Sequence, residues 1–365
     1  MHNTDFFRQK RVLLTGACGT IGQELLRQLL VDYGVAEVVA VDNNESEIFF
    51  LEQKFLDHPH CSFLLADTRD KEKLCRLMRG MDFVFHTAAY KHVVLCERSP
   101  FESVQTNILG VQNIIEAAAE NRIERVLFTS SDKAVNPTNV MGTSKLMGER
   151  LITAANSSQP IDGTIFASTR FGNVLGSRGS VIPIFREQIK KGGPITLTDH
   201  EMTRFIMSIK QAVQLVIDSI ALAQGGEVFV TKMPVIRIMD LARVMIRELA
   251  PWYGHNPEDI SIDVIGSKPG EKLYEELMTQ EETRRTVELQ NYFAVKPAFA
   301  SLYKNIQYTY PDMISDTVDN PYNSANEPVL DQDALREFLY SNQLLEGEPG
   351  EDFEPDQRFW GDEKS

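Results

Sequence analysis

The first half of the chain alternates short apolar runs with longer segments in which apolar residues recur every three or four positions. The short runs predict buried strands, and the longer segments predict helices that begin near residues 20, 46, 71, 101 and 139. This alternation is typical of a parallel sheet with helices on both faces. We therefore predict an α/β fold, a Rossmann-type doubly wound parallel sheet, with strands at 11–15, 37–41, 62–66, 83–86, 126–128 and 164–169.

A glycine-rich turn follows the first predicted strand and leads into a helical pattern. Its glycines are Gly16, Gly19 and Gly22, and Thr20 and Ile21 lie between the last two. Glycines at this spacing allow a tight turn, the approach of a pyrophosphate and close packing of helix on strand, while the helix N-terminus favours an anion. The turn predicts a dinucleotide-binding site.

The second predicted strand ends in Asp42, about 20 residues beyond the last glycine, as the dinucleotide fingerprint requires. A carboxylate there can accept hydrogen bonds from both ribose hydroxyls and would repel a 2'-phosphate. Asn43 and Asn44 follow it, with no arginine, so NAD is favoured over NADP.

Three further positions belong to the same predicted site. Asp67 follows the third strand and could hold the adenine amino group, although a polar loop residue accounts for it equally well. Ala88, in a run of small residues after the fourth strand, allows close approach of the cofactor. Asn107, on the long predicted helix 101–120, either orders the site from behind or caps a local bend.

Polar side chains crowd the end of the fifth predicted strand. Ser131, Asp132 and Lys133 follow it directly, and Met141 and Lys145 lie four residues apart on one face of the next helix. An open α/β sheet places its chemistry at this end of its strands. A carboxylic acid, a hydroxyl and two amines together predict a proton-transfer site, although an exposed Asp-Lys pair on a loop is the alternative for the short motif alone.

The chain changes character after Arg170. A glycine-rich stretch, 171–180, precedes predicted helices at 181–190, 211–223 and 238–249, strands at 195–198, 227–231 and 260–264, and a helix opened by Glu271. We predict an NAD-binding domain over 1–170, completed by strands returned from the later chain, and mainly a smaller α/β substrate-binding lobe over 171–295. Residues 296–365 are predicted to form an acidic extension, partly disordered, with a short helix near 334–345.

Composition narrows the class of protein. The formal net charge is -15, but 15 acidic and 3 basic residues lie between Asp312 and Ser365, so the remaining chain is nearly neutral and shows no basic nucleic-acid stripe. Cys18, Cys61, Cys75 and Cys96 form no CxxC pair and no cluster with histidine, which predicts reduced thiols and no metal site. No run approaches the roughly 18 apolar residues of a membrane span, and no signal-peptide pattern is present, so we expect a cytoplasmic protein.

Residues 11 to about 295 resemble the extended short-chain dehydrogenase/reductases, and within them the nucleotide-sugar 4,6-dehydratases that act on UDP-N-acetylglucosamine in capsule, flagellar and protein-glycan pathways. The motifs that carry the resemblance are TGACGTIG at 15–22, SSDKAVNPTNVMG at 130–142, RFGNVLGS at 170–177, MTRF at 202–205 and PGEK at 269–272. The resemblance implies NAD as cofactor, a nucleotide-diphosphate sugar as substrate, and dimers or larger assemblies.

Met141 departs from the wider superfamily, which has a tyrosine four residues before its lysine. A thioether cannot take a proton from a sugar hydroxyl. One branch of these dehydratases is similar in having methionine there together with Asp-Lys at the strand end, and the likeness implies retention of configuration at C5. Many members of that branch carry a preceding membrane-spanning region, which this sequence lacks.

The roles expected in this reaction follow from the chemistry of elimination. Lys133 would remove the C5 proton, and Asp132, with an upward-shifted pKa, would protonate the departing C6 hydroxyl. Lys133 would need a lowered pKa, which burial and the ammonium of Lys145 could supply. Lys145 would bind the nicotinamide ribose and Ser131 a substrate oxygen. A water held by Lys145 or Ser131 is our candidate acceptor for the O4 proton.

The resemblance also implies a set of substrate-binding residues. Arginine suits a diphosphate because its guanidinium donates two hydrogen bonds at once, while the alternative for each position is a surface ion pair. The expected contacts are Lys91, Asn173, Arg178, Arg204 and Glu271.

Other functions remain open at this point. A C5-inverting dehydratase or a C4-epimerase of the same family can also have methionine before the lysine. A non-catalytic NAD-binding protein is supported only by Met141, and the presence of Asp132, Lys133 and Lys145 together argues against it. The nucleotide is UDP or GDP.

Overall fold

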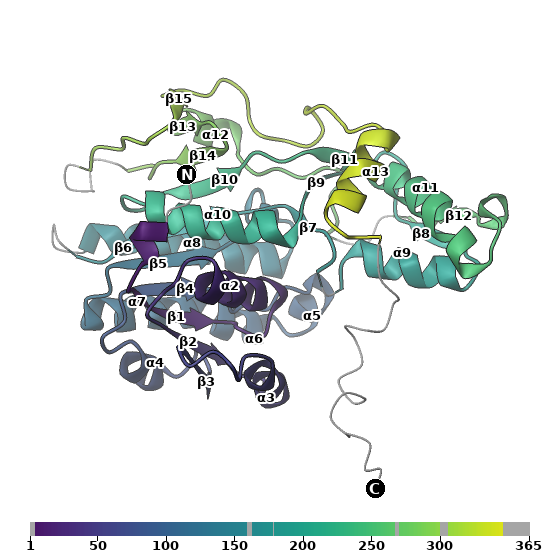
Figure 1. Ribbon diagram of the computed structural model, residues 1–365. Coiled ribbons are helices and arrows are strands. Elements are labelled where there is room, and N and C mark those ends of the chain that lie inside the picture. Colours follow the sequence, from purple (N-terminus) through teal and green to yellow (C-terminus); the bar gives the residue numbers. More distant parts are fainter. Residues whose placement is uncertain (1–3, 159–162, 178, 267–269, 300–305, 346–365) are drawn as a thin grey trace, which may run out of the picture. The chain divides into compact units, whose positions relative to one another are not determined.

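The computed structural model describes residues 4–158, 163–177, 179–266, 270–299 and 306–345 (Figure 1). The chain forms two compact units, each assembled from three stretches of sequence. Unit 1 comprises Met1–Gly172, Ile209–Met233 and Tyr274–Glu327. Unit 2 comprises Asn173–Ser208, Pro234–Leu273 and Pro328–Ser365.

Unit 1 is built on a ten-stranded sheet with the order β15-β13-β14-β10-β6-β5-β4-β1-β2-β3. The seven strands from β10 to β3 are parallel, and β14, β13 and β15 extend the sheet with antiparallel pairings. The strands are β1 (Arg11–Thr15), β2 (Glu37–Asp42), β3 (Cys61–Leu65), β4 (Phe83–His86), β5 (Arg125–Thr129), β6 (Ile165–Arg170), β10 (Val228–Thr231), β13 (Thr286–Leu289), β14 (Tyr292–Val295) and β15 (Met313–Ser315).

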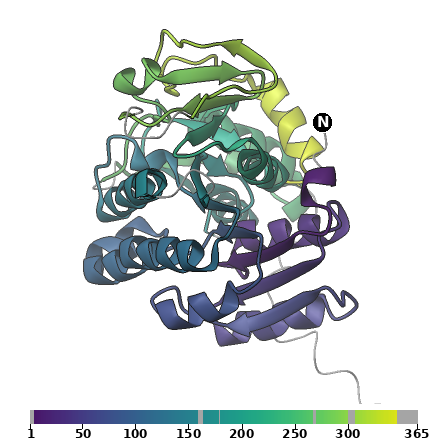
Figure 2. The same ribbon diagram turned by 90° about the vertical axis from the view of Figure 1, so that its left-hand side faces the viewer.

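Helices cover both faces of this sheet (Figure 2). Alternate residues of each strand point to opposite faces, so Val12 and Leu14 join one core while Leu13 joins the other. Helices α2 (Thr20–Val31), α3 (Glu45–Lys54) and α10 (Ile209–Leu222) pack in the first core, and α4 (Lys71–Leu77), α7 (Gly110–Asn121) and α8 (Val140–Ala155) in the second. The predicted doubly wound α/β fold is confirmed.

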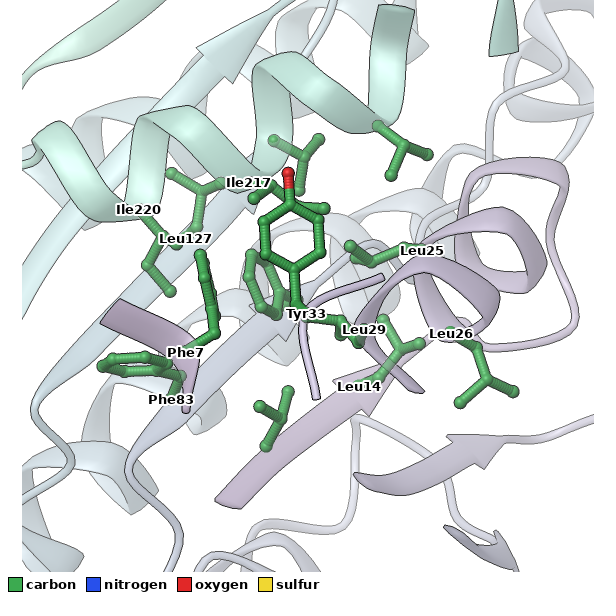
Figure 3. Close-up of a cluster of buried hydrophobic side chains, with 14 of the residues drawn as sticks. Phe7, Leu14, Leu25, Leu26, Leu29, Tyr33, Phe83, Leu127, Ile217 and Ile220 are labelled. Atoms are coloured by element: carbon green, nitrogen blue, oxygen red, sulfur yellow. The ribbon is translucent and has the colours of Figure 1, made fainter. Parts of the chain in front are cut away.

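The first core is closed by the N-terminal helix α1 (Thr4–Phe7) (Figure 3). Phe7 is fully buried and meets Tyr33 and Phe83 edge-on, with ring centroids 5.2 and 5.8 Å apart. Edge-to-face contacts of this kind add to the free energy gained from burying the rings. The residues before the first strand therefore belong to the core of unit 1.

The long helix predicted over 101–120 is divided into two α-helices by a π-helical turn. Helix α6 (Pro100–Val104) runs into the turn Gln105–Leu109, and α7 continues from Gly110. π-Helical turns are frequent at functional sites. This turn carries Asn107, which is 1% exposed and contacts the site described below.

Unit 2 has a core of its own, between short strands and three helices. Strands β7 (Asn173–Val174), β9 (Thr203–Met207) and β11 (Val235–Arg237) form one sheet, and β8 (Ile195–Leu197) pairs in parallel with β12 (Ile262–Val264). Helices α9 (Val181–Lys190), α11 (Ile238–Leu249) and α13 (Gln332–Ser341) pack against them. Their apolar faces, with Ile189, Leu241 and Leu335 fully buried, hold the unit together.

The structure divides the chain differently from the predicted ranges. Residues 209–233 and 274–295, predicted as mainly substrate lobe, lie in unit 1, where they supply α10, β10, β13 and β14. Strands β13, β14 and β15, which join the sheet through antiparallel pairings, were not predicted from the sequence.

One prediction for the C-terminal third was wrong. Glu271 opens no helix, because the main chain after it bonds to distant segments: Thr203 N donates to Leu273 O, and Leu277 N donates to Tyr322 O. Helix α13 (Gln332–Ser341), in unit 2, lies where a short helix was predicted near 334–345, and Met313–Ser315 add the unpredicted strand β15 to unit 1. Residues 346–365, where disorder was also predicted, lie outside the described residues.

In the part of the chain that the structure describes, no helix combines the length and the apolar character needed to cross a bilayer.

Candidate active site

The turn after β1 needs glycine at two positions. Gly16 has a φ of +74°, and a Cβ there would lie 2.5 Å from the Ala88 nitrogen. A Cβ on Gly22 would lie 2.1 Å from the Gly16 carbonyl oxygen. The first glycine therefore allows the turn to pack against the chain after β4, and the last allows α2 to pack against the turn.

A cavity of unit 1 lies at the end of strands β1, β2 and β4. Its lining includes Gly16, Gly19, Asp42, Asp67 and Ala88. Thr20, Ile21 and Gly22 form the first turn of α2, a helix end that favours an anion. The structure thus brings the predicted dinucleotide residues together at one edge of the sheet.

The two carboxylates of this cavity are held in different ways. Asp42 accepts hydrogen bonds of 3.1 Å from the backbone N–H groups of Cys18 and Asn44, which orient it at the end of β2. Asp67 accepts side-chain hydrogen bonds from Arg69, and they hold its pKa below its usual value. The main-chain N–H donors leave Asp42 with side-chain lone pairs for a ribose, whereas the lone pairs of Asp67 are largely engaged by Arg69.

A three-residue cluster follows β5 at its carboxyl end. Ser131 caps a 3₁₀ turn, Asp132–Ala134, and its Oγ donates a 2.6 Å hydrogen bond to Asp132 Oδ1. Lys133 Nζ lies 2.9 Å from Asp132 Oδ2 and 3.2 Å from Oδ1. The side chain of Asp132 is 4% exposed and that of Lys133 is 33% exposed. The acid of this ion pair is therefore buried, while its amine is partly exposed to solvent.

The expectation that Asp132 has a raised pKa was wrong for the structure as it stands. Burial works to raise the pKa, but the charge of Lys133 and hydrogen bonds from Ser131, Lys133 and Glu275 outweigh it, and the pKa is lowered. Lys133 is an ammonium in this ion pair and has to lose a proton before it can act as a base. Both members of the couple are therefore held in the opposite protonation state to the one that elimination requires.

Lys145 is the fully enclosed amine of the site. Its Nζ donates a 2.8 Å hydrogen bond to the Thr129 carbonyl oxygen and lies 4.7 Å from the centre of the Phe128 ring. Burial lowers its pKa to about 8, against an opposing contribution from Glu149. Met141, one turn earlier on α8, is 4% exposed. The lowered pKa of Lys145 suits an amine that exchanges protons near neutral pH, and the lowered pKa expected of Lys133 stays a prediction.

Asn107 ties the loop after β4 to helix α8. Its Oδ1 accepts from Tyr90 N, and its Nδ2 donates to Tyr90 O and to Ser144 Oγ. One side chain from the π-helical turn therefore holds three polar groups, Tyr90 N, Tyr90 O and Ser144 Oγ. Of the two roles considered for Asn107, the hydrogen bonds match the one that orders the site from behind.

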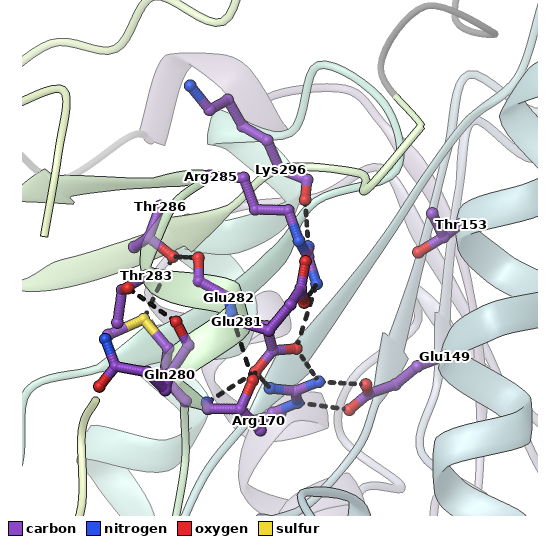
Figure 4. Close-up of polar contacts among 12 residues, drawn as sticks. Glu149, Thr153, Arg170, Gln280, Glu281, Glu282, Thr283, Arg285, Thr286 and Lys296 are labelled. Atoms are coloured by element: carbon purple, nitrogen blue, oxygen red, sulfur yellow. Dashed lines mark hydrogen bonds and ion pairs between the residues drawn. The ribbon is translucent and has the colours of Figure 1, made fainter. Parts of the chain in front are cut away.

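A buried ion cluster fixes α8 from its other side (Figure 4). Arg170, at the end of β6, makes two hydrogen bonds of 2.7 and 2.8 Å to Glu149 and two of 2.9 Å to Glu282. All three side chains are at most 4% exposed. Glu149 lies one turn after Lys145, so the cluster holds the part of α8 that presents the lysine.

His86 ends β4 beneath this site and is neutral. Its Nδ1 is 2.7 Å from Thr15 Oγ1, and its ring stacks on Phe128 with centroids 5.6 Å apart. Complete burial, together with the charge of Lys145, lowers its pKa to about 3. The histidine therefore does not compete with Lys145 for a proton near neutral pH.

The predicted substrate contacts are distributed over both units. In unit 1, Lys91 lines a second cavity of about 280 Å³ together with Tyr90, His92 and Ser103. In unit 2, Arg204 Nη2 is 3.7 Å from Glu271 Oε1 and 2.9 Å from Lys272 O, so these two predicted residues are brought together. Asn173, also in unit 2, donates to Phe205 O.

Arg178 lies outside the described residues.

Sequence reasoning missed several residues of the site. Glu275 and Glu149 lie outside the identified motifs, and Arg170 opens one of them without having been given a role; only tertiary contacts show the part of all three. Glu275 had one available signal, since it stands three residues after the PGEK motif at 269–272. His86 had none, because a histidine at a strand end is usually a core residue.

Two proteins of known sequence are similar to this chain over most of its length. It is 49% identical over 307 residues to an uncharacterized membrane protein of Methanocaldococcus jannaschii, covering 84% of this chain and 92% of the relative. It is 37% identical over 304 residues to a UDP-N-acetylglucosamine 4,6-dehydratase (inverting) of Campylobacter jejuni, covering 83% of this chain and 87% of the relative.

A solved structure agrees with the fold. The X-ray structure of Pen from Bacillus thuringiensis superposes with a TM-score of 0.86 at 42% sequence identity, covering 93% of this chain and 100% of Pen. The model of the polysaccharide biosynthesis protein family matches residues 12–297. The chain belongs to the polysaccharide biosynthesis protein family.

Proposed function

We propose that the protein is an NAD-dependent nucleotide-sugar 4,6-dehydratase, which converts UDP-N-acetylglucosamine or GDP-N-acetylglucosamine to the 4-keto-6-deoxy sugar with retention at C5. The observation that carries the proposal is the buried Asp132, paired with Lys133 and Ser131 at the end of β5. An acid and an amine in contact at a strand end are what elimination of water across C5 and C6 needs. The relationship to the Campylobacter dehydratase supports the reaction class.

The cofactor site fits NAD on the geometry of unit 1. The Gly16 turn leaves no room for a Cβ, the α2 N-terminus follows it, and Asp42 is oriented toward the same cavity. When bound, NAD would accept a hydride from C4 and return it to C6, so that none is consumed. Lys145, with a pKa of about 8, can hold the nicotinamide ribose and exchange protons near neutral pH.

Each proton transfer of the reaction is assigned to a different group. Oxidation at C4 makes the C5 proton acidic, and Lys133, once neutral, removes it. Asp132, once protonated, gives its proton to the departing C6 hydroxyl. Ser131, whose Oγ already donates to Asp132, lies where it can also contact the substrate oxygen. Met141 offers no proton-transfer group, so the O4 proton passes to a water held by Lys145 or Ser131.

The substrate's diphosphate and nucleoside are assigned to the charged residues that the family motifs contain. Arg204 and Glu271 supply a paired guanidinium and carboxylate, and Lys91, Asn173 and Arg178 complete the set. A guanidinium can bind a diphosphate through two hydrogen bonds at once.

A panel assay tests this function. Purified enzyme would be incubated with UDP-, GDP- and dTDP-linked N-acetylglucosamine and glucose, and the absorbance of the 4-keto product followed. Proton NMR of the product then separates retention from inversion at C5, and dehydration from C4-epimerisation. A product that keeps oxygen at C6 would overturn the dehydratase proposal.

Two variants test the assigned residues. Asp132→Asn and Lys133→Ala each remove one proton-transfer group, and we expect each to lower kcat by about 10²- to 10⁴-fold. NAD binding, followed by fluorescence quenching, should stay within about threefold of wild type, since neither residue lines the dinucleotide cavity. Full turnover by both variants would show that this pair does not carry the reaction.

A further inference from the structure

A second carboxyl group stands beside the Asp132–Lys133 pair. Glu275 Oε1 lies 3.8 Å from Lys133 Nζ, and its side chain is 6% exposed. A hydrogen bond between the side chains of Glu275 and Asp132 is one of the contributions that lower the pKa of Asp132. One ammonium is therefore shared by two buried carboxyl groups that also contact each other.

The backbone holds Glu275 in this place from both sides. Its N–H donates a 2.9 Å hydrogen bond to Ser324 Oγ, and its carbonyl oxygen accepts one of 2.9 Å from Ser324 N. Ser324 is fully buried. The next residue, Glu276, forms an antiparallel bridge with Asn323. A side chain on a backbone fixed this firmly keeps its position relative to Asp132.

Charge and hydrogen bonding together assign the protons. Two carboxylates cannot hydrogen-bond to each other unless one of them carries a proton. Asp132 is the ionised member, because it accepts from Ser131 and Lys133 as well. Glu275 is then the donor, and the resting group of three is neutral overall, which avoids an uncompensated negative charge in a buried site.

We propose that Glu275 is a positioning residue for proton transfer, whose carboxyl group shares one proton with Asp132 and thereby prepares the acid and the base of the reaction. The proposal rests on the dehydratase function proposed above. Glu275 acts through Asp132 and Lys133, not on the sugar itself.

The protonation state that can carry out the reaction, called the working form here, arises when Asp132, Lys133 and Glu275 together lose one proton. Two adjacent carboxylates and one ammonium remain, and moving a proton from Lys133 to Asp132 removes the repulsion between the carboxylates. The result is a neutral amine on Lys133 and a protonated acid on Asp132, which elimination requires. Without Glu275, the transfer of a proton from Lys133 to Asp132 would break their ion pair and relieve no repulsion. The transfer would therefore cost more free energy than it does beside the Glu275 carboxylate.

The step balances in atoms and charge. Lys133 takes the C5 proton, the C5–H electron pair becomes the C5–C6 double bond, and the C6–O bond breaks as Asp132 protonates the leaving oxygen, which departs as water. Lys133 later returns its proton to C5 as C6 receives the hydride that was taken from C4, which saturates the C5–C6 double bond. The proton released from O4 replaces the one that Asp132 lost, so the group of three ends in the working form in which it began the step.

Other charged groups near this cluster have partners of their own. Glu276 accepts hydrogen bonds from Asn136 Nδ2, at 3.1 and 3.2 Å, and is half-buried. Arg170 donates to Leu277 O but is otherwise bound to Glu149 and Glu282. Ser131 contributes only a hydroxyl. The titration of the cluster should therefore be governed by Asp132, Lys133 and Glu275.

The test is the pH dependence of turnover by the full-length enzyme with the nucleotide sugar that the panel identifies. Glu275→Gln keeps a hydrogen-bonding side chain but cannot share a proton. We expect kcat to fall by about 10²-fold with KM within about threefold of wild type, and the acid limb of the kcat profile to move about one unit to lower pH. Glu275→Asp should recover at least part of the activity and of the limb position.

Glu276→Gln is the matched control, since it removes the neighbouring carboxylate, and should leave both kcat and the pH profile at wild-type values. The proposal is overturned if Glu275→Gln keeps wild-type kcat and limbs. It is also overturned if kcat falls while the limbs stay in place, because a purely structural role gives that result.

A spectroscopic measurement covers the case in which Glu275→Gln does not fold. Carbon-13 NMR of enzyme labelled in its glutamate carboxyls should show one signal that is still protonated at neutral pH and that changes in Asp132→Asn. The absence of such a signal overturns the proposal. If wild-type enzyme converts no nucleotide sugar, the proposed function fails, and this measurement still tests the shared proton by itself.

Discussion

Lys145 donates a hydrogen bond of 2.8 Å to the carbonyl oxygen of Thr129, which places a buried amine directly at the end of strand β5. The contact joins the helix that carries the lysine to the strand after which Asp132 and Lys133 stand. Gly142 makes this approach possible, because a Cβ there would lie 2.1 Å from the Lys133 carbonyl oxygen. The end of β5 thus places the amine of Lys133, and the start of α8 places the amine of Lys145.

The buried amine makes stability depend on pH in a defined direction. The pKa of Lys145 is about 8 in the folded protein against 10.5 for an ordinary lysine, so between these pH values the unfolded chain binds more protons. Wild type should therefore gain about 3 kcal/mol relative to Lys145→Met as the pH rises from below 8 to above 10.5. Urea unfolding of both proteins across this range measures the gap, and a gap that does not change with pH would contradict the assignment.

The ion cluster at Arg170 predicts a large loss of stability when it is broken. Arg170→Met leaves Glu149 and Glu282 buried without their cation, which should cost about 3–5 kcal/mol. Arg27→Met is the control, since Arg27 pairs with Glu24 and Asp32 at the surface, where such a pair contributes about 0–1 kcal/mol. Chemical denaturation compares the two, and equal losses would show that burial does not set the strength of the cluster.

The same cluster predicts sensitivity to acid. Attraction to Arg170 outweighs burial and lowers the pKa of Glu282 to about 2, below the ordinary 4.5, so its contribution is complete above pH 4.5 and is lost as the pH falls toward 2. In Glu282→Gln this part of the acid dependence should disappear. The slope of unfolding free energy against pH between 2 and 5 is the measurement, and an unchanged slope would assign the dependence to other carboxyl groups.

Asp42 predicts the choice of dinucleotide. Asp42→Ala removes the carboxylate that repels a 2'-phosphate, so the preference for NAD over NADP should fall by about tenfold or more. Glu45→Ala, which removes an exposed carboxylate at the start of α3, should leave the preference unchanged. Dissociation constants for both dinucleotides decide between these outcomes, and a preference retained in Asp42→Ala would place cofactor selection elsewhere.

Met141 predicts tolerance to an apolar exchange. Met141→Leu nearly conserves volume at a buried position, so it should cost less than about 1.5 kcal/mol of stability. Because neither side chain transfers protons, kcat should stay within about threefold of wild type. A loss of turnover much greater than this, in a variant with wild-type thermal unfolding, would give the thioether a role in the reaction that its chemistry does not suggest.

The parallel sheet and the residues at the carboxyl ends of its strands can be read from the amino-acid sequence. Buried strands such as 83–86 read as continuous apolar runs, and Gly16, Gly22 and Asp42 stand at spacings set by local backbone geometry. Periodicity and turn chemistry are short-range properties, so they can be read along the chain.

The contacts between charged groups could not be read from the sequence, because they depend on how the chain folds. Glu275 lies far along the chain from Asp132, and Glu282 from Arg170, yet each pair is in contact. The pKa of Asp132 was predicted in the wrong direction for the same reason. A pKa depends on burial and on neighbours through space, and both are fixed by the folding of distant segments onto one another.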